Sequence, residues 1–334
     1  MNKNKSFFNW VLIAKGIGIV LVVVGHFYPK NSPEYWSDIR DIIYTFHMPL
    51  FFLLSGFLYS YTKHTYSVLI NGKVKRLIYP FISIAILFFV IKYLSGLFFY
   101  LENPVGLESV YALLTNPIDS YMPLLWFVHA LFLIFLIYPL TRNLIGNNFI
   151  ILIIFILINV VFGNDYIFFG KALANVPFFI IGVILRENTR VRDAVITDKW
   201  FYVGVPLMIF CFVYLAKLNM DSGNQIDYIF RLVLGVTGTI CIINMSSLID
   251  ANNKGIGKLI LTEIGIYSMT IYLFHTLFES AVRIGFQQVL GDFQVSFEIV
   301  AFTAVIAGIV FPLLLEKIFL RNNMITKKYI LGLA

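Results

Sequence analysis

Residues 149–161 read FIILIIFILINVV, an apolar run with no charged residue and no regular alternation of apolar and polar positions. Such a run predicts a helix in lipid, because the strands of a transmembrane barrel alternate between two faces. Similar runs occur along all 334 residues, of which 59% are hydrophobic and 13% are charged. A soluble domain carries roughly 45–50% apolar and about 25% charged residues. The composition therefore predicts an all-α integral membrane protein, and it excludes a soluble enzyme, a secreted module and a disordered chain.

The apolar runs predict a bundle of about ten transmembrane helices, since one span needs about 20 mostly apolar residues. The predicted spans are residues 10–28, 42–62, 77–100, 122–140, 149–163, 172–185, 200–217, 229–249, 264–286 and 296–320. The fifth and sixth spans are short, so nine and eleven helices are alternatives. No connecting segment is long enough for a soluble domain, and we expect a single transmembrane domain over residues 1–334 with none appended.

The basic residues predict the orientation of the bundle. Seventeen Lys and Arg residues fall in the segments on one side and six on the other, which predicts that both termini are cytoplasmic. The net charge of +7 is explained by these short segments and by anionic headgroups, so nucleic acid is not an expected partner. Cys211 and Cys241 lie in apolar runs and are predicted to be buried thiols rather than a disulfide, metal or redox site.

Ionisable side chains inside the predicted spans are candidates for function, because lipid makes them costly. Four of the five histidines are of this kind: His26, His47, His129 and His275. Lys15 and His26 are eleven residues apart, which places them on one helix face with a rise of about 16 Å. In the alternative interpretation, Lys15 reaches the headgroups and His26 caps the helix end.

Three further groups of polar residues have structural alternatives. His47 is followed by Pro49, which can open the helix, and it could simply hydrogen-bond a neighbouring span. Trp126 shares a face with His129 and could be an ordinary interfacial aromatic residue. A polar stripe at helical spacing consists of Ser268, Tyr272, His275, Glu279 and Arg283. Its two charged members could pair with each other.

Motifs for other chemistries are missing from the sequence. The four histidines come from four separate spans and no HExxH pair is present, so no metal site is predicted. The chain also has no G-x-S-x-G elbow and no Walker A loop, which disfavours a serine hydrolase and an ATP-driven pump. Lys73, Lys75 and Arg76 lie in the predicted loop before the third span, where they could bind phosphate on lipid or on a nucleotide-like donor.

The chain resembles the acyltransferase-3 family of bacterial membrane O-acyltransferases, and within it the fucose 4-O-acetylase-like branch. The likeness covers the whole length. The segments that carry it are Lys15 to His26 with a basic-residue-x10-His spacing, Phe46-His47-Met48-Pro49-Leu50-Phe51-Phe52 with Ser55-Gly56-Phe57, Lys73-x-x-Arg76 with Tyr79-Pro80, Leu125-Trp126-Phe127, and Ile271 to His275. Two positions depart from the family pattern: Lys15 stands where many members have Arg, and Leu12 where many have Asp.

The resemblance implies ten or eleven helices in a bacterial cell membrane. It implies transfer of an acyl group, usually acetyl from cytoplasmic acetyl-CoA, to a sugar hydroxyl at or beyond the outer face. His26 would be the catalytic histidine, Lys15 its basic partner, and Lys73 and Arg76 the ligands of the coenzyme A phosphates. A neutral histidine suits this role, since it can take the hydroxyl proton near pH 7.

The predicted catalytic residues are therefore His26 and Lys15, with Lys15 approached by the pantetheine arm or stabilising the oxyanion. The predicted substrate-binding residues are Lys73, Lys75, Arg76, His47, Ser55, Trp126, His129, His275 and Glu279. Acetyl-CoA is expected as a substrate and no cofactor as a permanent group. Succinyl is an alternative acyl group, and glycan-assembly proteins are possible partners if transfer is relayed.

The acceptor is left open among capsule, O-antigen, exopolysaccharide and a lipid-linked precursor. A transporter or flippase for a lipid-linked glycan is the alternative function, because polar residues inside spans suit it as well. The sequence shows none of the internal similarity that marks many transporters. A polymerase-like assembly factor would need a large charged outer loop, which the sequence lacks. A transporter would neither bind nor consume acetyl-CoA.

Overall fold

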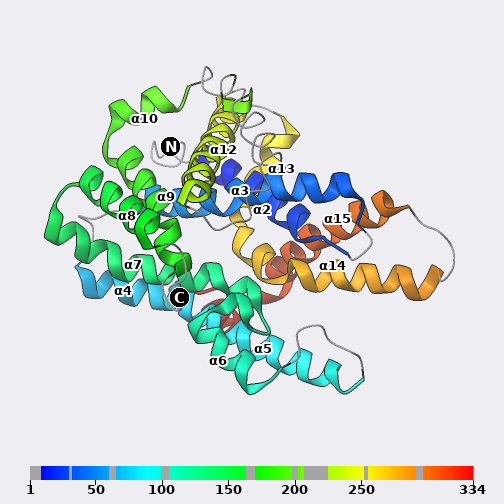
Figure 1. Cartoon of the computed structure of the whole chain (residues 1–334). Helices are drawn as coiled ribbons and strands as arrows, with labels where there is room; N and C mark the ends of the chain where they lie inside the picture. The colour runs from blue at the N-terminus through cyan, green and yellow to red at the C-terminus, as the bar shows by residue number, and fades with distance from the viewer. Residues whose placement is uncertain are drawn as a thin grey trace. The chain divides into compact units, whose positions relative to one another are not determined.

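The computed structural model of the chain describes residues 9–29, 32–59, 65–98, 105–162, 170–197, 202, 204–206, 225–251, 255–290 and 296–333. Over these residues the secondary structure is helical, without a β-strand (Figure 1). The all-α class predicted from composition is therefore confirmed. The predicted span at 200–217 lies almost wholly outside the described residues, as does Cys211.

Five helical segments in the described ranges are long and apolar enough to cross a membrane. They are Asn9–His26, Tyr66–Gly96, Pro123–Ile145, Tyr228–Ala251 and Phe297–Leu320. A sixth is added when the bent pair Ile256–Ile266 and Ser268–Val289 is taken as one span. These segments indicate a multi-pass membrane protein. The number of about ten spans and the cytoplasmic termini stay predictions.

The chain divides into two compact units. Unit 1 comprises residues 1–54 and 187–318, and unit 2 comprises residues 55–186 and 319–334, in both cases as far as the residues are described. Each unit therefore combines two stretches that are far apart in the sequence.

Unit 1 is arranged around helix α2 (Asn9–His26). Its other elements are the first part of α3 (Glu34–Phe57), α10 (Thr189–Val195), α12 (Gln225–Ala251), α13 (Ile256–Ile266), α14 (Ser268–Leu290), α15 (Phe297–Leu315) and most of η4 (Glu316–Leu320). Helix α2 contacts α12, α13, α14 and α15. Helices α14 and α15 also pack closely along each other (Figure 1). The central position of α2 follows from its composition, because small and apolar residues lie on all its sides.

Glycine allows α2 and α13 to approach backbone to backbone. A Cβ atom at Gly16 would meet the main-chain carbonyl of Leu261, and one at Gly265 would meet the carbonyl of Leu12. Close approach through small residues is the usual means of packing helices in lipid, where no hydrophobic effect drives them together. This reciprocal contact fixes the position of α2 relative to α13. It thereby also fixes the position of His26, the last residue of α2.

The predicted span at 264–286 falls mainly on α14, with its first residues on α13. The structure has two helices there, α13 and α14, which are bent by 85° around Tyr267. Apolar composition does not encode direction, and Gly265, which packs against α2, lies one residue before the end of α13. The whole predicted polar stripe nevertheless lies on one uninterrupted helix, α14.

Unit 2 consists mainly of helices packed around α7 (Trp126–Ile145). The others are α4 (Tyr66–Lys73), the π-helical turn η1 (Val74–Ile78), α5 (Tyr79–Gly96), α6 (Leu107–Thr115), the short turns η2 (Pro117–Asp119) and η3 (Pro123–Leu125), α8 (Asn148–Phe162), α9 (Gly170–Glu187) and α16 (Met324–Tyr329). Helix α7 contacts α4, η1 and α8. The prediction of a loop at residues 73–76 is wrong, because α4, η1 and α5 form one helical segment from Tyr66 to Gly96.

Candidate active site

Three of the four predicted span histidines meet in unit 1. The ring centroid of His26 lies 5.1 Å from that of His275 and 6.2 Å from that of His47. These residues come from the end of α2, the middle of α3 and the first half of α14. His47 and His275 are only 2% and 0% exposed, whereas His26 is half-buried. His26 is therefore the member of this histidine cluster that a substrate can reach most easily.

The hydrogen bonds of the three rings fix their protonation pattern. Each Nδ1 lies 2.8–3.0 Å from a main-chain oxygen three or four residues earlier: Val22 for His26, Ile43 for His47, and Ile271 and Tyr272 for His275. A carbonyl oxygen only accepts, so each Nδ1 donates. A neutral imidazole then has its lone pair on Nε2, and all three histidines present Nε2 as a proton acceptor.

Several buried polar atoms of unit 1 have no hydrogen-bond partner among the described residues. On α14 these are Nε2 of His275 and Oε1 of Glu279, whose side chain is 4% exposed. On α12 they are the hydroxyls of Tyr228 and Thr239 and both amide atoms of Asn244. Buried polar groups are normally paired, so their accumulation on two helices that contact α2 indicates an interior suited to a polar ligand. Oε1 of Glu279 therefore has no hydrogen bond to Arg283, contrary to the predicted alternative in which these two residues pair.

An arginine and two tyrosines extend the histidine cluster. The Tyr44 ring centroid lies 5.8 Å from that of His26 and 4.9 Å from that of His47. The guanidinium carbon of Arg40 lies 4.6 Å from the Tyr44 ring and 4.5 Å from the Tyr28 ring. Arg40 is thus held between two aromatic faces, where cation–π attraction fixes its plane. Its buried Nε has no hydrogen-bond partner in the described structure, and Asp41 approaches Nη1 only to 3.9 Å.

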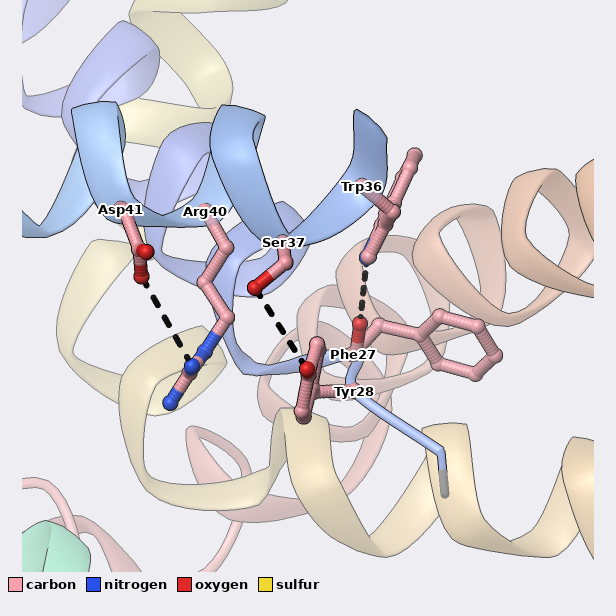
Figure 2. A network of polar contacts seen from close by, with 6 residues as sticks. All are labelled: Phe27, Tyr28, Trp36, Ser37, Arg40 and Asp41. Atoms are coloured by element: carbon pink, nitrogen blue, oxygen red, sulfur yellow. Dashed lines mark hydrogen bonds and ion pairs between the residues drawn. The ribbon is translucent and has the colours of Figure 1, made fainter. Parts of the chain in front are cut away.

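Polar contacts between the end of α2 and the start of α3 hold this arrangement (Figure 2). The indole Nε1 of Trp36 donates to the Phe27 carbonyl at 2.7 Å, and the Tyr28 hydroxyl donates to Ser37 at 3.5 Å. Figure 2 shows Trp36 and Ser37 directed from α3 toward Phe27 and Tyr28, and Arg40 on the same helix. These contacts fix the position of Tyr28, and thereby one side of the Arg40 stack.

Arg40 and Tyr44 were not among the predicted site residues. The available signal was their spacing, because Arg40, Tyr44 and His47 are at positions i, i+4 and i+7 of α3 and so share one face. Arg40 is one of the six cations predicted to lie in the outer segments, so the cost of an ionisable group in lipid does not single it out.

Lys15 lies on α2 with His26, as predicted, and is half-buried. Because α2 is uninterrupted from Asn9 to His26, eleven residues separate the two along its axis by about 16 Å. That distance is too long for the ammonium group and the imidazole to act on the same atom.

The other predicted site residues belong to unit 2. They are Ser55, Lys73, Lys75, Arg76, Trp126 and His129. The Lys73 ammonium nitrogen lies 3.6 Å from the Phe135 ring centroid, whereas Lys75 and Arg76 are exposed. Trp126 and His129 are half-buried on α7, and the His129 ring lies 6.4 Å from that of Phe81. His129 therefore belongs to a different unit from the histidine cluster.

The described ranges contain no group of three or more His, Cys, Asp or Glu side chains arranged to hold a metal ion. In the histidine cluster, each Nδ1 is already engaged by a main-chain oxygen. What the cluster offers is three proton acceptors beside an arginine. This arrangement suits the removal of a proton from a hydroxyl group and the binding of an oxygen-rich substrate.

Comparison with known proteins identifies the family. Residues 8–317 match the sequence model of the acyltransferase-3 family, which is described as an acyltransferase domain. The chain is also 28% identical over 210 residues to the nodulation protein NolL of Mesorhizobium japonicum, a match that covers 60% of this chain. It spans about half of that relative's length, 53%. No solved structure matches the chain. Because the family match covers nearly the whole chain, the protein belongs to the acyltransferase-3 family.

Proposed function

We propose that this protein is a membrane O-acetyltransferase that moves an acetyl group from cytoplasmic acetyl-CoA to a sugar hydroxyl. The observation that carries the proposal is the 2.8 Å contact between Nδ1 of His26 and the Val22 carbonyl oxygen. This Nδ1 donates to the Val22 carbonyl, so the lone pair on Nε2 is available to a substrate. Family membership supports the reaction class.

In the proposed step, the sugar hydroxyl gives its proton to Nε2 of His26 as its oxygen attacks the thioester carbonyl carbon. The carbon–sulfur bond then breaks, and the sulfur leaves as a thiolate that takes the proton back from the imidazolium. The ester and free coenzyme A are the products, and His26 returns to its neutral form. General base catalysis of this kind contributes about 10²–10⁴-fold to a rate.

His47 and His275 are proposed as positioning residues for this step. Their Nε2 atoms are able to accept a hydrogen bond, so they can orient the attacking hydroxyl or stabilise the His26 imidazolium that forms. Glu279 is proposed to bind a substrate polar group, because its buried Oε1 has no partner among the described residues. Arg40 is proposed to bind acceptor oxygens, since a guanidinium fixed between two rings presents its donors in a planar fork.

Lys15 is proposed to bind the acyl donor at a distance from the reacting carbon. About 16 Å along α2 separates it from His26, which disfavours the alternative in which it stabilises the oxyanion. The donor phosphates are proposed to bind Lys75 and Arg76, whose exposed side chains are accessible to solutes. Lys73, whose ammonium group lies over the Phe135 ring, would add to the positive electrostatic potential of this basic segment. Ser55, Trp126 and His129 are proposed to contact substrate in unit 2.

The acceptor is proposed to be a cell-surface or lipid-linked sugar, and the location a bacterial plasma membrane. The relative's name mentions only nodulation, so it does not define the acceptor of this chain. The candidate acceptors are capsule, O-antigen, exopolysaccharide and a lipid-linked precursor. Succinyl transfer and relay through a glycan-assembly protein are the alternatives to direct acetyl transfer.

The test is acetyl transfer in inverted membrane vesicles that contain the native glycan. Labelled acetyl-CoA is added to vesicles with wild type, His26→Ala, or the control His64→Ala, which changes the one histidine outside the predicted spans. We expect label in alkali-labile ester with wild type and His64→Ala and at least 100-fold less with His26→Ala, at equal protein levels.

The outcomes separate the possible errors. Full activity in His26→Ala would remove His26 as the base while leaving the acetyltransferase in place. No label with any variant, in the presence of the native glycan, would contradict acetyl transfer. A transporter for a lipid-linked glycan would then be favoured if wild-type vesicles also fail to bind acetyl-CoA.

A further inference from the structure

The segment that follows η4 lies against the basic π-helical turn of unit 2. Gly332 has a φ of +62°, and a Cβ atom built there would lie 2.7 Å from both the Cα of Arg76 and the carbonyl oxygen of Lys75. The Tyr329 and Tyr79 rings are 5.4 Å apart, and α16 contacts α5. Residues about 250 positions apart in the sequence therefore form one face, which we call the basic face: η1 together with residues 324–333.

The basic face carries positive charge from both of its segments. Lys75 and Arg76 on η1 are exposed, as are Lys327 and Lys328 on α16. Neither residues 65–98 nor residues 319–333 contain Asp or Glu, so no acidic residue of these segments neutralises the cations. A concentration of exposed cations of this kind attracts phosphate groups.

The local backbone supports a ligand site here. The turn η1 is π-helical, and single π-helical turns within α-helices occur frequently at functional sites. The Lys328 ammonium nitrogen lies 5.0 Å from the centroid of the Tyr329 ring, which pairs with the Tyr79 ring, and aromatic faces are surfaces on which nucleic-acid bases stack. Positive charge next to an aromatic pair is suited to a nucleotide rather than to inorganic phosphate alone.

We propose that residues 324–333 complete the binding site for the phosphates of the acyl donor, with Lys327 and Lys328 acting alongside Lys75 and Arg76. The ligand class is a nucleotide that carries several phosphate groups. This inference rests on the proposed function for the use of a coenzyme A thioester. It adds that donor binding depends on a segment about 250 residues away from the basic motif on η1.

Gly332 lets the two segments approach each other at main-chain distance. Any side chain there would collide with the main chain of η1, which cannot yield as a flexible side chain can, and the positive φ adds strain for an L-residue. Gly332→Ala should therefore detach residues 330–333 from η1 without removing a charge. Gly72→Ala is the matched control, because a Cβ at Gly72 on α4 meets nothing within 4 Å.

The experiment measures binding of coenzyme A to the purified full chain in nanodiscs of zwitterionic lipid. The proteins are wild type, Gly332→Ala, Gly72→Ala and Lys327→Ala/Lys328→Ala, with thermal unfolding recorded for each. We expect coenzyme A affinity about tenfold lower for Gly332→Ala and for the double lysine variant, and unchanged for Gly72→Ala. Dephospho-coenzyme A should discriminate less between the variants, because it carries less charge.

A parallel arm measures attachment of the detergent-purified proteins to vesicles that contain anionic phospholipid. If the double lysine variant loses attachment to these vesicles but binds coenzyme A like wild type, the face binds lipid headgroups and the proposal is overturned. Wild-type affinity in both the glycine and the lysine variants overturns it as well, while leaving the proposed function intact. Absence of coenzyme A binding in wild type would instead contradict the proposed function, and this inference with it.

Discussion

The histidine cluster of unit 1 and the basic face of unit 2 differ in the burial of their polar side chains. In the cluster, His47 and His275 are almost fully buried and every Nδ1 is tied to a main-chain oxygen. On the basic face, Lys75, Arg76 and the two lysines of α16 are exposed. In the cluster, hydrogen bonds fix the orientation of each imidazole ring. On the basic face, the exposed cationic side chains can adjust their positions to a flexible ligand.

This contrast separates two kinds of effect on catalysis. Groups that are buried and oriented act on the transition state, so changing them should lower kcat. Exposed charges act on encounter and binding, so changing them should raise the KM of the donor and should depend on salt.

The largest effect is expected from replacing His47 or His275 by Asn. The Asn amide nitrogen can still donate to the earlier main-chain oxygen, but the acceptor corresponding to Nε2 is lost. If Nε2 takes part in positioning, kcat for acetyl transfer should fall by about 100-fold while the KM for acetyl-CoA changes little. Thermal unfolding in detergent should stay close to wild type. Wild-type kcat in both variants would show that these two histidines only pack.

An intermediate effect is expected from Lys75→Ala/Arg76→Ala in unit 2. Loss of two exposed phosphate ligands should raise the KM for acetyl-CoA by about tenfold at low salt and leave kcat within about twofold. Measured at about 0.5 M salt, the difference from wild type should largely vanish, because screening shortens the range of exposed charges. Arg142→Gln is the control, since it changes a half-buried cation of unit 2 that donates to the Gly146 carbonyl. A fall in kcat instead of a rise in KM would refute the division between the two regions.

The smallest effect is expected from Arg40→Lys. This change keeps the charge but removes the planar group between Tyr28 and Tyr44, which costs about 0.5–2 kcal/mol of cation–π attraction. The initial rate at low glycan concentration should fall by about three- to tenfold, with the KM for acetyl-CoA unchanged. Arg231→Lys on α12 is the matched control, because Arg231 is an exposed arginine of the same unit. Equal rates for the two variants would show that the stack does not act on the acceptor.

Much of the helical framework could be predicted from the sequence, because apolar composition and run length are local properties. Helices α2, α7, α12 and α15 overlap predicted spans closely, and the polar stripe ending at Arg283 lies on one helix as expected. Two local features were not predicted. The 85° bend at Tyr267 and the continuous helix through residues 73–76 depend on packing that composition does not report.

Individual residues of the candidate site were predicted from the sequence, but not which of them lie close together. His26, His47 and His275 were each identified from the cost of a polar group in lipid. The same argument selected His129, which lies in the other unit beside Phe81. Arg40 was not predicted, because the free-energy cost of an ionisable group in lipid selects only residues inside the predicted spans.

Residue types alone predict a helical membrane protein with ionisable groups in its spans, because lipid selects residue types one position at a time. Which of those groups meet depends on how the helices pack. The contact of α2 with α12, α13 and α14, the tautomers set by main-chain oxygens, and the seating of Gly332 on η1 are all of this kind. The physical reason is that such contacts join residues far apart in the chain, and no local pattern records the partner that packing selects.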